Sequence, residues 1–233
     1  MDPRGAALVV GASSDIGAAV ARGLTADGFD CLLWGRDRDR LAAVGPRWDV
    51  VDLRSPADVR AGLDRLPGRL SAVVYAAGLF DWAPADAGAP DVWDELVAVN
   101  LTAAMRVTRG VLPALLAAAP SSLVLLGSGA ARTAFPGNPA YVASKHGLAG
   151  FARSVFLDVR DRDVAVTLLS PGLVAAGAGL RAPGVRAGEL LQPDDVAAAV
   201  RWVVGTPAHV CPVEIELQPQ RSPAPPGDGP ATG

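Results

Sequence analysis

The most informative chemical feature of this sequence is a tyrosine and a lysine four residues apart. Lys145 is the only lysine among 21 basic residues, and Tyr141 is one of two tyrosines. Positions i and i+4 lie on one face of a helix, so the phenol and the ammonium are neighbours if this segment is helical. An ammonium stabilises a phenolate, so we expect Lys145 to lower the pKa of Tyr141 from its usual value of about 10. The same spacing is also common on solvated helix faces.

Two further polar residues could complete a site around this pair. Ser128 lies 13 residues before Tyr141 and directly after an apolar run, and Asn100 lies in a predicted helix. A serine hydroxyl can hydrogen-bond a carbonyl oxygen and stabilise negative charge that develops there. Taken singly, Ser128 could be a turn residue, and Asn100 could be a helix residue that bonds the backbone.

Short apolar runs alternate with helical patterns and would position these residues. Most of the runs are continuously apolar, which is typical of strands buried on both faces. The predicted strands span residues 6–10, 30–34, 49–51, 70–75, 123–126, 164–169 and 213–217, and the predicted helices span 16–28, 56–66, 90–118, 139–161 and 193–204. This alternation predicts an α/β fold: a doubly wound parallel sheet of about seven strands, with helices on both faces, in a single domain over residues 1–217.

A glycine-rich loop joins the first predicted strand to the first predicted helix. It reads Gly11-Ala12-Ser13-Ser14-Asp15-Ile16-Gly17. Glycine lets the backbone turn tightly and approach a pyrophosphate, and the helix N-terminus offers free N–H groups to it. Asp15 brings a carboxylate near the phosphates, unless its side chain caps the helix. The alternative is an ordinary glycine-rich turn.

The end of the second predicted strand indicates which dinucleotide is bound. An acidic residue at this point would bind the ribose diol of NAD. Gly35 occupies the position and Arg36 follows it, and a guanidinium suits a 2′-phosphate. We therefore expect NADP(H). The alternative is that Arg36, Arg38 and Arg40 are surface charges, with residues 37–40 forming a solvated turn or a phosphate contact.

Together these motifs resemble the short-chain dehydrogenase/reductase family over about residues 6–217. Tyr141 and Lys145 match the family's YxxxK motif, Ser128 has the family's spacing to the tyrosine, and Asn100 matches the asparagine of the fourth helix. The glycine loop resembles GxxxGxG, with Asp15 at the middle glycine.

The resemblance also implies a set of cofactor-binding positions. Asp52 and Leu53 resemble the pair that contacts adenine. Ala76 to Gly78 resemble the end of the Asn-Ala-Ala-Gly signature, with Tyr75 in place of the sheet-stabilising asparagine. The implied set is Gly11, Ser13, Ser14, Asp15, Ile16, Gly17, Arg36, Asp52, Leu53, Ala76, Ala77, Gly78, Asn100, Tyr141, Lys145, Pro171, Gly172 and Val174.

The activity that the resemblance implies is NADP(H)-dependent reduction of a ketone or similar carbonyl. Tyr141 would be the general acid, and Ser128 would bind the carbonyl oxygen. Lys145 would also hold the nicotinamide ribose, and Asn100 would hold a water that connects Lys145 to solvent. Imine reduction and redox-linked epimerisation remain open as alternative reactions.

The segment that covers the substrate in the family departs from the usual pattern. Ala176 stands where the family often has threonine, and loop 173–191 is short and rich in glycine and alanine, so we expect a short mobile lid. Together with Asp15, these departures leave a non-catalytic NADP(H) sensor as an alternative. Phe80, Trp82 and Phe135 could form pocket walls, although core packing is the commoner fate of such residues.

The bulk properties exclude several classes of function. The chain has 233 residues, a net charge of −3 and a pI of about 5.4. No run of lysine or arginine forms a basic stripe, so nucleic acid and anionic membranes are poor partners. No apolar run reaches the roughly 18 residues of a membrane span. We expect a cytoplasmic protein that acts on a small-molecule carbonyl substrate.

Cysteine, histidine and proline usage completes the prediction. Cys31 and Cys211 lack CxxC spacing and are expected to be reduced core thiols. His146 and His209 are far apart in the sequence, so no metal site is expected. Residues 218–233 are rich in proline and lack large apolar residues, which predicts a flexible tail. The family resemblance implies a homo-oligomer, a tetramer or a dimer.

Overall fold

A seven-stranded parallel sheet forms the centre of the computed structural model, which describes residues 4–87, 89–177, 179–181 and 186–221. The strand order is β3-β2-β1-β4-β5-β6-β7. The strands are β1 (Ala6–Val10), β2 (Asp30–Gly35), β3 (Trp48–Val50), β4 (Ala72–Tyr75), β5 (Ser121–Leu126), β6 (Val164–Pro171) and β7 (Glu214–Leu217). The order reverses between β1 and β4, the point at which doubly wound sheets of the Rossmann type bind ligands. The predicted fold class is confirmed.

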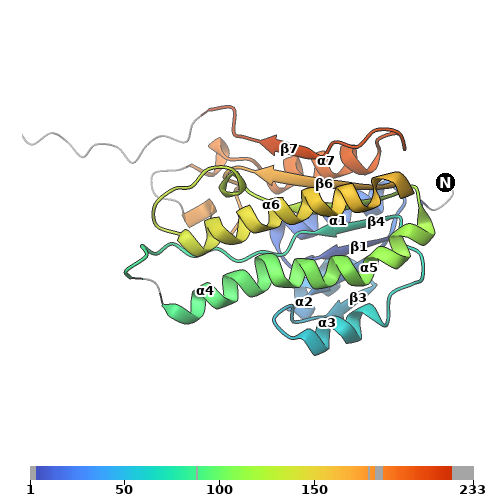
Figure 1. Ribbon diagram of the computed structural model, residues 1–233, viewed down its shortest axis with the longest axis horizontal. Helices are drawn as coiled ribbons and strands as arrows, with labels where there is room; N and C mark the ends of the chain where they lie inside the picture. Colours follow the sequence, from blue (N-terminus) through green and yellow to red (C-terminus); the bar gives the residue numbers. More distant parts are fainter. Residues whose placement is uncertain (1–3, 88, 178, 182–185, 222–233) are drawn as a thin grey trace, which may run out of the picture.

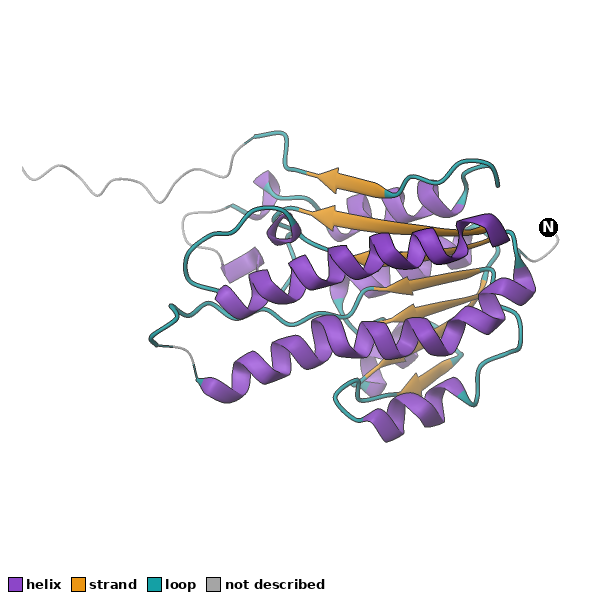
Figure 2. Ribbon diagram, in the orientation of Figure 1, coloured by secondary structure: helices purple, strands orange, loops and turns teal. Residues whose placement is uncertain are grey.

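Helices cover both faces of the sheet (Figures 1 and 2). One face carries α1 (Asp15–Ala26), α2 (Arg38–Val44) and α7 (Pro193–Val204). The other carries α3 (Pro56–Leu63), α4 (Pro90–Val97), α5 (Ala104–Ala118) and α6 (Pro139–Val159), which lie in front of the sheet in Figure 1. Because all strands are parallel, their carboxyl ends meet at one edge of the sheet, and there the chain leaves β1 toward one face and leaves β4 toward the other.

Alternate residues of the central strands enter two separate cores. In β1, Leu8 and Val10 are buried in the core under α5 and α6, whereas Ala7 and Val9 are buried in the core under α1 and α7. Burial on both faces explains why these strands are continuously apolar in the sequence.

The short helix α2 is missing from the prediction, which assigned residues 37–40 to a solvated turn or a phosphate contact. Asp37 is instead the N-cap, and its side chain accepts a hydrogen bond from the backbone N–H of Arg40 at 3.1 Å. Only Leu41 of this helix is buried. A single apolar anchor leaves almost no periodic signal in the sequence.

The predicted helix 90–118 is interrupted by a π-helical segment, Ala98–Ala103. By length and a mean hydropathy of 1.2, the stretch Asp91–Ala118 could cross a membrane. In this fold its α5 part packs on the sheet through buried residues that include Val107, Val111 and Leu115. π segments are often found at functional sites, and this one contains Asn100.

The two cysteines differ in burial. Cys31 is a buried free thiol, as predicted, but Cys211 is only half-buried, so its assignment to the core was wrong. Burial raises the pKa of both thiols. The start of the predicted tail lies against the fold, because Gln218 contacts the position of Gly172. Residues 222–233 of that tail lie outside the described residues.

Candidate active site

The glycine loop is held tightly against the end of β4. Gly11 has φ of +87°, and a Cβ there would lie 2.7 Å from the backbone nitrogen of Ala77. A Cβ on Gly17 would lie 2.2 Å from the carbonyl oxygen of Gly11. Neither position can take a side chain without moving the backbone. The loop therefore leaves the N-terminus of α1 uncovered at the sheet edge, as an anion-binding loop requires.

Ser14, rather than Asp15, caps α1. The Ser14 hydroxyl accepts a hydrogen bond from Gly17 N at 3.1 Å and donates one to Gly11 O at 2.8 Å. Asp15 lies half-exposed in the first turn and forms an ion pair with Arg40. The alternative in which Asp15 caps the helix is wrong, because the N-cap is one residue earlier. Arg40 supplies a positive charge beside the carboxylate that replaces the family's glycine.

A pocket opens beside this loop at the carboxyl ends of β1 to β4. Its lining is Val10, Gly11, Ser13, Ser14, Trp34, Gly35, Arg36, Val51, Asp52, Leu53, Ala77, Gly78, Leu79 and Val99. Eight of the predicted cofactor residues belong to this lining: Gly11, Ser13, Ser14, Arg36, Asp52, Leu53, Ala77 and Gly78. Asp15, Ile16, Gly17 and Ala76 are not part of the lining and flank it in the sequence.

The three arginines after β2 have different surroundings. Arg38 lies over the ring of Trp48, with its guanidinium carbon 5.3 Å from the ring centroid, and Arg40 pairs with Asp15. Arg36 lines the pocket. A Cβ on Gly35 would lie 2.5 Å from the Ser13 hydroxyl, so an acidic side chain in this position would require Ser13 to move.

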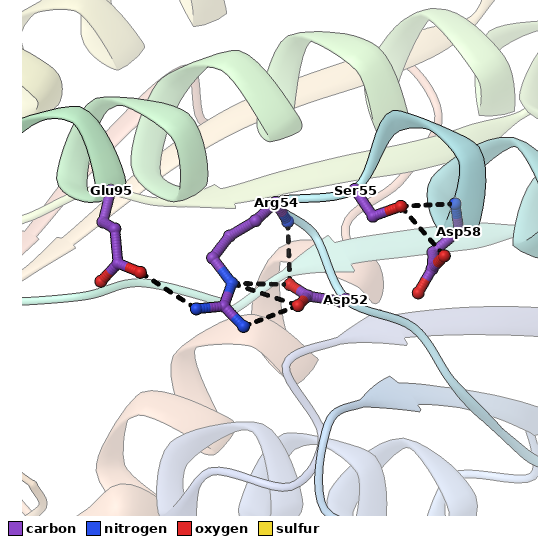
Figure 3. A network of polar contacts seen from close by, with 5 residues as sticks. All are labelled: Asp52, Arg54, Ser55, Asp58 and Glu95. Atoms are coloured by element: carbon purple, nitrogen blue, oxygen red, sulfur yellow. Dashed lines mark hydrogen bonds and ion pairs between the residues drawn. The ribbon is translucent and has the colours of Figure 1, made fainter. Parts of the chain in front are cut away.

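Asp52 is bound by a neighbouring arginine that the sequence did not single out (Figure 3). The Arg54 Nε and Nη2 atoms donate to the two Asp52 oxygens at 3.0 and 2.7 Å, and Arg54 Nη1 donates to Glu95 at 3.0 Å. Hydrogen bonding by Arg54 lowers the pKa of Asp52, and the charge of Arg36 adds to the effect. The network joins the loop after β3 to α4 at the rim of the pocket.

The predicted Tyr–Lys pair comes together on α6. The Lys145 Nζ atom lies 5.7 Å from the centroid of the Tyr141 ring and donates to the carbonyl oxygen of Leu126, the last residue of β5, at 2.9 Å. Lys145 is buried, and burial lowers its pKa to about 8. An arginine could not make this contact in the same way, since its planar guanidinium is larger than an ammonium.

The predicted direction of the Tyr141 pKa is wrong for this structure. Burial raises that pKa, and hydrogen bonding with Ser128 lowers it only in part. Desolvation penalises the phenolate, and the Lys145 ammonium is directed to the Leu126 carbonyl. The structure therefore brings Ser128, Tyr141 and Lys145 together as predicted but keeps the phenol protonated.

The Asn100 side chain makes three hydrogen bonds within the protein. Its Oδ1 accepts from Leu79 N at 2.7 Å, and its Nδ2 donates to Leu79 O at 3.0 Å and to the Ser144 hydroxyl at 3.1 Å. A Cβ on Gly78 would lie 3.5 Å from Asn100 Oδ1 and 3.6 Å from Lys145 Nζ. Asn100 Oδ1 and Lys145 Nζ therefore both lie over Gly78. Within the Asn100 side chain, Oδ1 has one lone pair left to accept a hydrogen bond from a water.

Two supporting residues had no role in the sequence prediction. The Ser144 hydroxyl accepts from Asn100 and donates to the Tyr141 carbonyl at 2.8 Å, which joins the π segment to α6. The Tyr75 hydroxyl donates to the carbonyl of Val99 at 2.6 Å and so anchors the same segment to β4. Ser144 is a small polar residue directly before Lys145, and this position was the signal in the sequence that could have indicated its role.

The end of β6 supplies the remaining predicted residues. Pro171 ends the strand, Gly172 N donates to Leu217 O at 2.7 Å, and Val174 pairs with Leu191 in an isolated parallel bridge. This bridge joins the two ends of loop 173–191. Residues 178 and 182–185, on which part of the predicted mobile lid falls, lie outside the described residues.

Aromatic rings stand beside Tyr141. Phe80 meets the Tyr141 ring edge-on with centroids 4.8 Å apart, and Trp82 packs on Phe80 at 5.9 Å. Trp82 is 64% exposed and Phe135 is 37% exposed. The core alternative is therefore wrong for Trp82 and Phe135, and Phe80 is only partly buried. We call Phe80 and Trp82 the aromatic wall.

Known proteins resemble this chain in sequence and in fold. A family model described as short chain dehydrogenase matches residues 5–181. Sulfoacetaldehyde reductase 2 of Chromohalobacter salexigens is 32% identical, over 92% of this chain and 94% of its own length. D-threitol dehydrogenase of Mycolicibacterium smegmatis is 31% identical, over 87% of this chain and 86% of its own. A short chain dehydrogenase of Escherichia coli, solved with NADPH, superposes with a TM-score of 0.86 at 26% identity and covers 94% of this chain and 98% of its own.

Proposed function

Because the chain belongs to the short-chain dehydrogenase/reductase family, we propose that it is an NADP(H)-dependent oxidoreductase that reduces a ketone or related carbonyl to a secondary alcohol. The observation that carries the proposal is the cluster of Ser128, Tyr141 and Lys145, in which burial raises the pKa of the Tyr141 phenol beside a lysine and so keeps the phenol protonated. A protonated phenol is the form that a general acid must have before it acts.

The pocket beside the glycine loop fits a dinucleotide. Gly11 and Gly17 leave room for a pyrophosphate at the start of α1, where a Cβ would collide with the backbone. Asp52 and Leu53 would lie against the adenine, and Arg36 would pair with a 2′-phosphate. Pro171, Gly172 and Val174 would lie along the nicotinamide, as the family resemblance implies. The solved NADPH complex of the Escherichia coli relative supports this choice.

The chain's own residues would then divide the work of carbonyl reduction. When bound, NADPH supplies the hydride. Ser128 hydrogen-bonds the carbonyl oxygen and stabilises the negative charge that develops there. Tyr141 donates its proton to the same oxygen. Lys145 favours the phenolate that remains, because its charge lies on the same helix face.

Reprotonation of Tyr141 needs a path to solvent. Lys145 Nζ and Asn100 Oδ1 converge above Gly78, which has no side chain to separate them. A water held there by the free lone pair of Asn100 Oδ1 would pass a proton toward Lys145. The three hydrogen bonds of the Asn100 side chain fix this oxygen in place.

The quaternary state and location of the protein follow from family analogy. We propose a cytoplasmic homo-oligomer, a tetramer or a dimer, assembled through α5 and α6. Met105 on α5 and Leu157 on α6 are 44% and 64% exposed, which leaves apolar surface on both helices for a second copy.

The test is an initial-rate assay with NADPH and, separately, NADH on a panel of ketones, aldehydes, β-keto esters and cyclic imines. The names of the two relatives above point to different substrates, an aldehyde sulfonate and a polyol, so the panel must be broad. Turnover of a carbonyl with preference for NADPH would support the proposal. Reduction of imines alone would replace the ketone with an imine as the substrate.

A non-catalytic NADP(H) sensor is a second candidate because Asp15, Ala176 and the short loop 173–191 depart from the family pattern. The Asp15 carboxylate lies in the first turn of α1, where the phosphates would bind, and Arg40 pairs with it. Tight NADPH binding without turnover on any panel member would favour the sensor over the reductase.

A further inference from the structure

Asn138, the N-cap of α6, has a buried side-chain amide without a hydrogen-bond partner in the part of the chain that the structure describes. The residue is 3% exposed, and both Oδ1 and Nδ2 are unpaired. Burying an amide without partners costs free energy, and native structures rarely retain one without a reason. Both an acceptor and a donor are therefore available at this point.

Helix capping does not account for the choice of asparagine here. An asparagine at an N-cap normally accepts from an N–H two or three residues later. Asn138 has φ of −162° and ψ of 58°, and its side chain makes no capping bond. Its backbone carbonyl accepts from Val142 N at 3.1 Å, so the helix begins without help from the side chain.

The chain on either side of Asn138 lies against the aromatic wall. Gly137 precedes Asn138 with φ of +86°, and a Cβ there would lie 3.0 Å from Trp82 Nε1. Tyr141 follows three residues later and meets Phe80 edge-on at 4.8 Å. The residues on both sides of Asn138 therefore contact the wall that borders the proposed proton donor.

The charged residue nearest to Asn138 in the sequence already has an ion-pair partner. Arg132, on the same connection between β5 and α6, donates to Glu214 at 2.6 Å. Its guanidinium therefore binds a carboxylate of β7 instead of an anionic substrate. The apolar wall and the neutral amide together favour an uncharged ligand.

We propose that Asn138 is a substrate-specificity residue, whose amide hydrogen-bonds a hydroxyl adjacent to the reacting carbonyl of a neutral α-hydroxy ketone. A hydroxyl is the small group that can donate to Oδ1 and accept from Nδ2. The apolar part of the substrate lies against Phe80 and Trp82. This assignment rests on the proposed reductase function of the same site.

The Asn138 amide is buried, so a substrate can reach it only if a neighbouring side chain moves. Trp82 is 64% exposed and contacts Phe80 with a tilted ring at 5.9 Å, so little holds it in place. Its indole edge lies over Gly137. Rotation of Trp82 would open the space beside Asn138, and a substrate ring would then take its place against Phe80.

The test compares two probes, 2-hydroxyacetophenone and propiophenone, which differ by a hydroxyl in place of a methyl group. We expect the wild type to reduce the hydroxy ketone with a kcat/KM about tenfold higher, the usual worth of one hydrogen bond. Asn138→Leu, which is similar in shape and apolar, should abolish this preference. It should lower kcat/KM for the hydroxy ketone and leave the value for propiophenone within about twofold.

Two further measurements separate a binding role from a structural one. Asn138→Leu should leave the melting temperature unchanged or raise it, because it removes unpaired buried atoms. In the complex with NADP⁺, where no hydride is available, the Kd of 2-hydroxyacetophenone should rise about tenfold in the variant. Asn138→Ala should weaken this binding to a similar extent.

Different results would overturn different claims. Equal losses for both ketones, or a lower melting temperature with unchanged Kd, would make Asn138 a structural residue and leave the reductase function intact. Selective binding of the hydroxy ketone without any turnover would uphold Asn138 and contradict the reductase. Turnover of both ketones without preference for the hydroxyl in wild type would contradict the assignment of Asn138 alone.

Discussion

The ammonium nitrogen of Lys145 lies 5.7 Å from the centroid of the Tyr141 ring, and it donates its hydrogen bond to the Leu126 carbonyl. The lysine therefore stands beside the phenol without being bound to its oxygen. Both groups are shifted by burial toward their neutral forms. A second charged or polar group, supplied by cofactor or substrate, is needed to change this balance.

The buried Lys145 should make stability depend on pH. Its pKa is about 8 in the folded protein and near 10.5 when unfolded. The free-energy cost of burying the charged ammonium is therefore complete below pH 8 and is relieved as pH rises toward 10.5. Relative to Lys145→Met, the cofactor-free wild type should gain up to about 3 kcal/mol over this window. Urea unfolding of both proteins between pH 7 and 10 measures the difference, in which cysteine and tyrosine contributions cancel. Parallel curves would contradict the depressed pKa.

Arg36 should determine the preference for NADPH. Arg36→Ala should raise the Kd of NADPH by roughly ten- to a hundredfold, since a charge-assisted contact is lost, and leave the Kd of NADH unchanged. Arg38→Ala is the matched control, because Arg38 lies over Trp48 rather than in the pocket. Fluorescence titration with both cofactors makes the comparison. Equal effects of the two substitutions would assign the preference to net charge alone.

Gly11 should tolerate no side chain, for steric as well as conformational reasons. Gly11 and Gly28 have similar φ values of +87° and +92°, but a Cβ would collide with Ala77 only at Gly11. Gly28→Ala should cost about 1–2 kcal/mol of unfolding free energy from backbone strain. Gly11→Ala should cost about 1–3 kcal/mol more and weaken dinucleotide binding. Chemical denaturation and cofactor titration test this pair, and equal costs would contradict the close approach.

Tyr75 should stabilise the fold without taking part in the reaction. Tyr75→Phe removes a 2.6 Å hydrogen bond and leaves the buried Val99 carbonyl short of a partner. We expect a loss of about 1–3 kcal/mol in the free energy of unfolding, with turnover reduced less than tenfold. Urea unfolding and steady-state kinetics on one preparation measure both effects. Unchanged stability would mean that the π segment is held by other contacts.

The sheet and the site residues could be predicted from the sequence for different reasons. Strands buried on both faces leave continuous apolar runs, which predicted the five inner strands β1, β2, β4, β5 and β6 within a few residues. The edge strands β3 and β7 were also predicted, although each contains at least one acidic residue. The i, i+4 spacing on α6 brought Tyr141 and Lys145 together as expected. These features depend on local periodicity, which the sequence carries directly.

What could not be predicted depends on contacts between distant segments. The direction of the Tyr141 pKa is set by burial under other elements, which the spacing does not contain. The cap of α1 depended on which of two adjacent polar residues reached Gly17, and Ser14 does. The pairing of Arg54 with Glu95 joins residues 41 positions apart, so no local pattern marked it.

The most direct test of the central claim is the matched removal of one hydroxyl from each of the two tyrosines. For Tyr141→Phe we expect turnover of the best carbonyl substrate to fall by roughly a hundred- to ten-thousandfold, with the Kd of NADPH and the free energy of unfolding unchanged. For Tyr75→Phe we expect the free energy of unfolding to fall by about 1–3 kcal/mol and turnover to fall less than tenfold. If Tyr141→Phe retained turnover within about tenfold of wild type, Tyr141 would not be the proton donor and the proposed mechanism would be wrong.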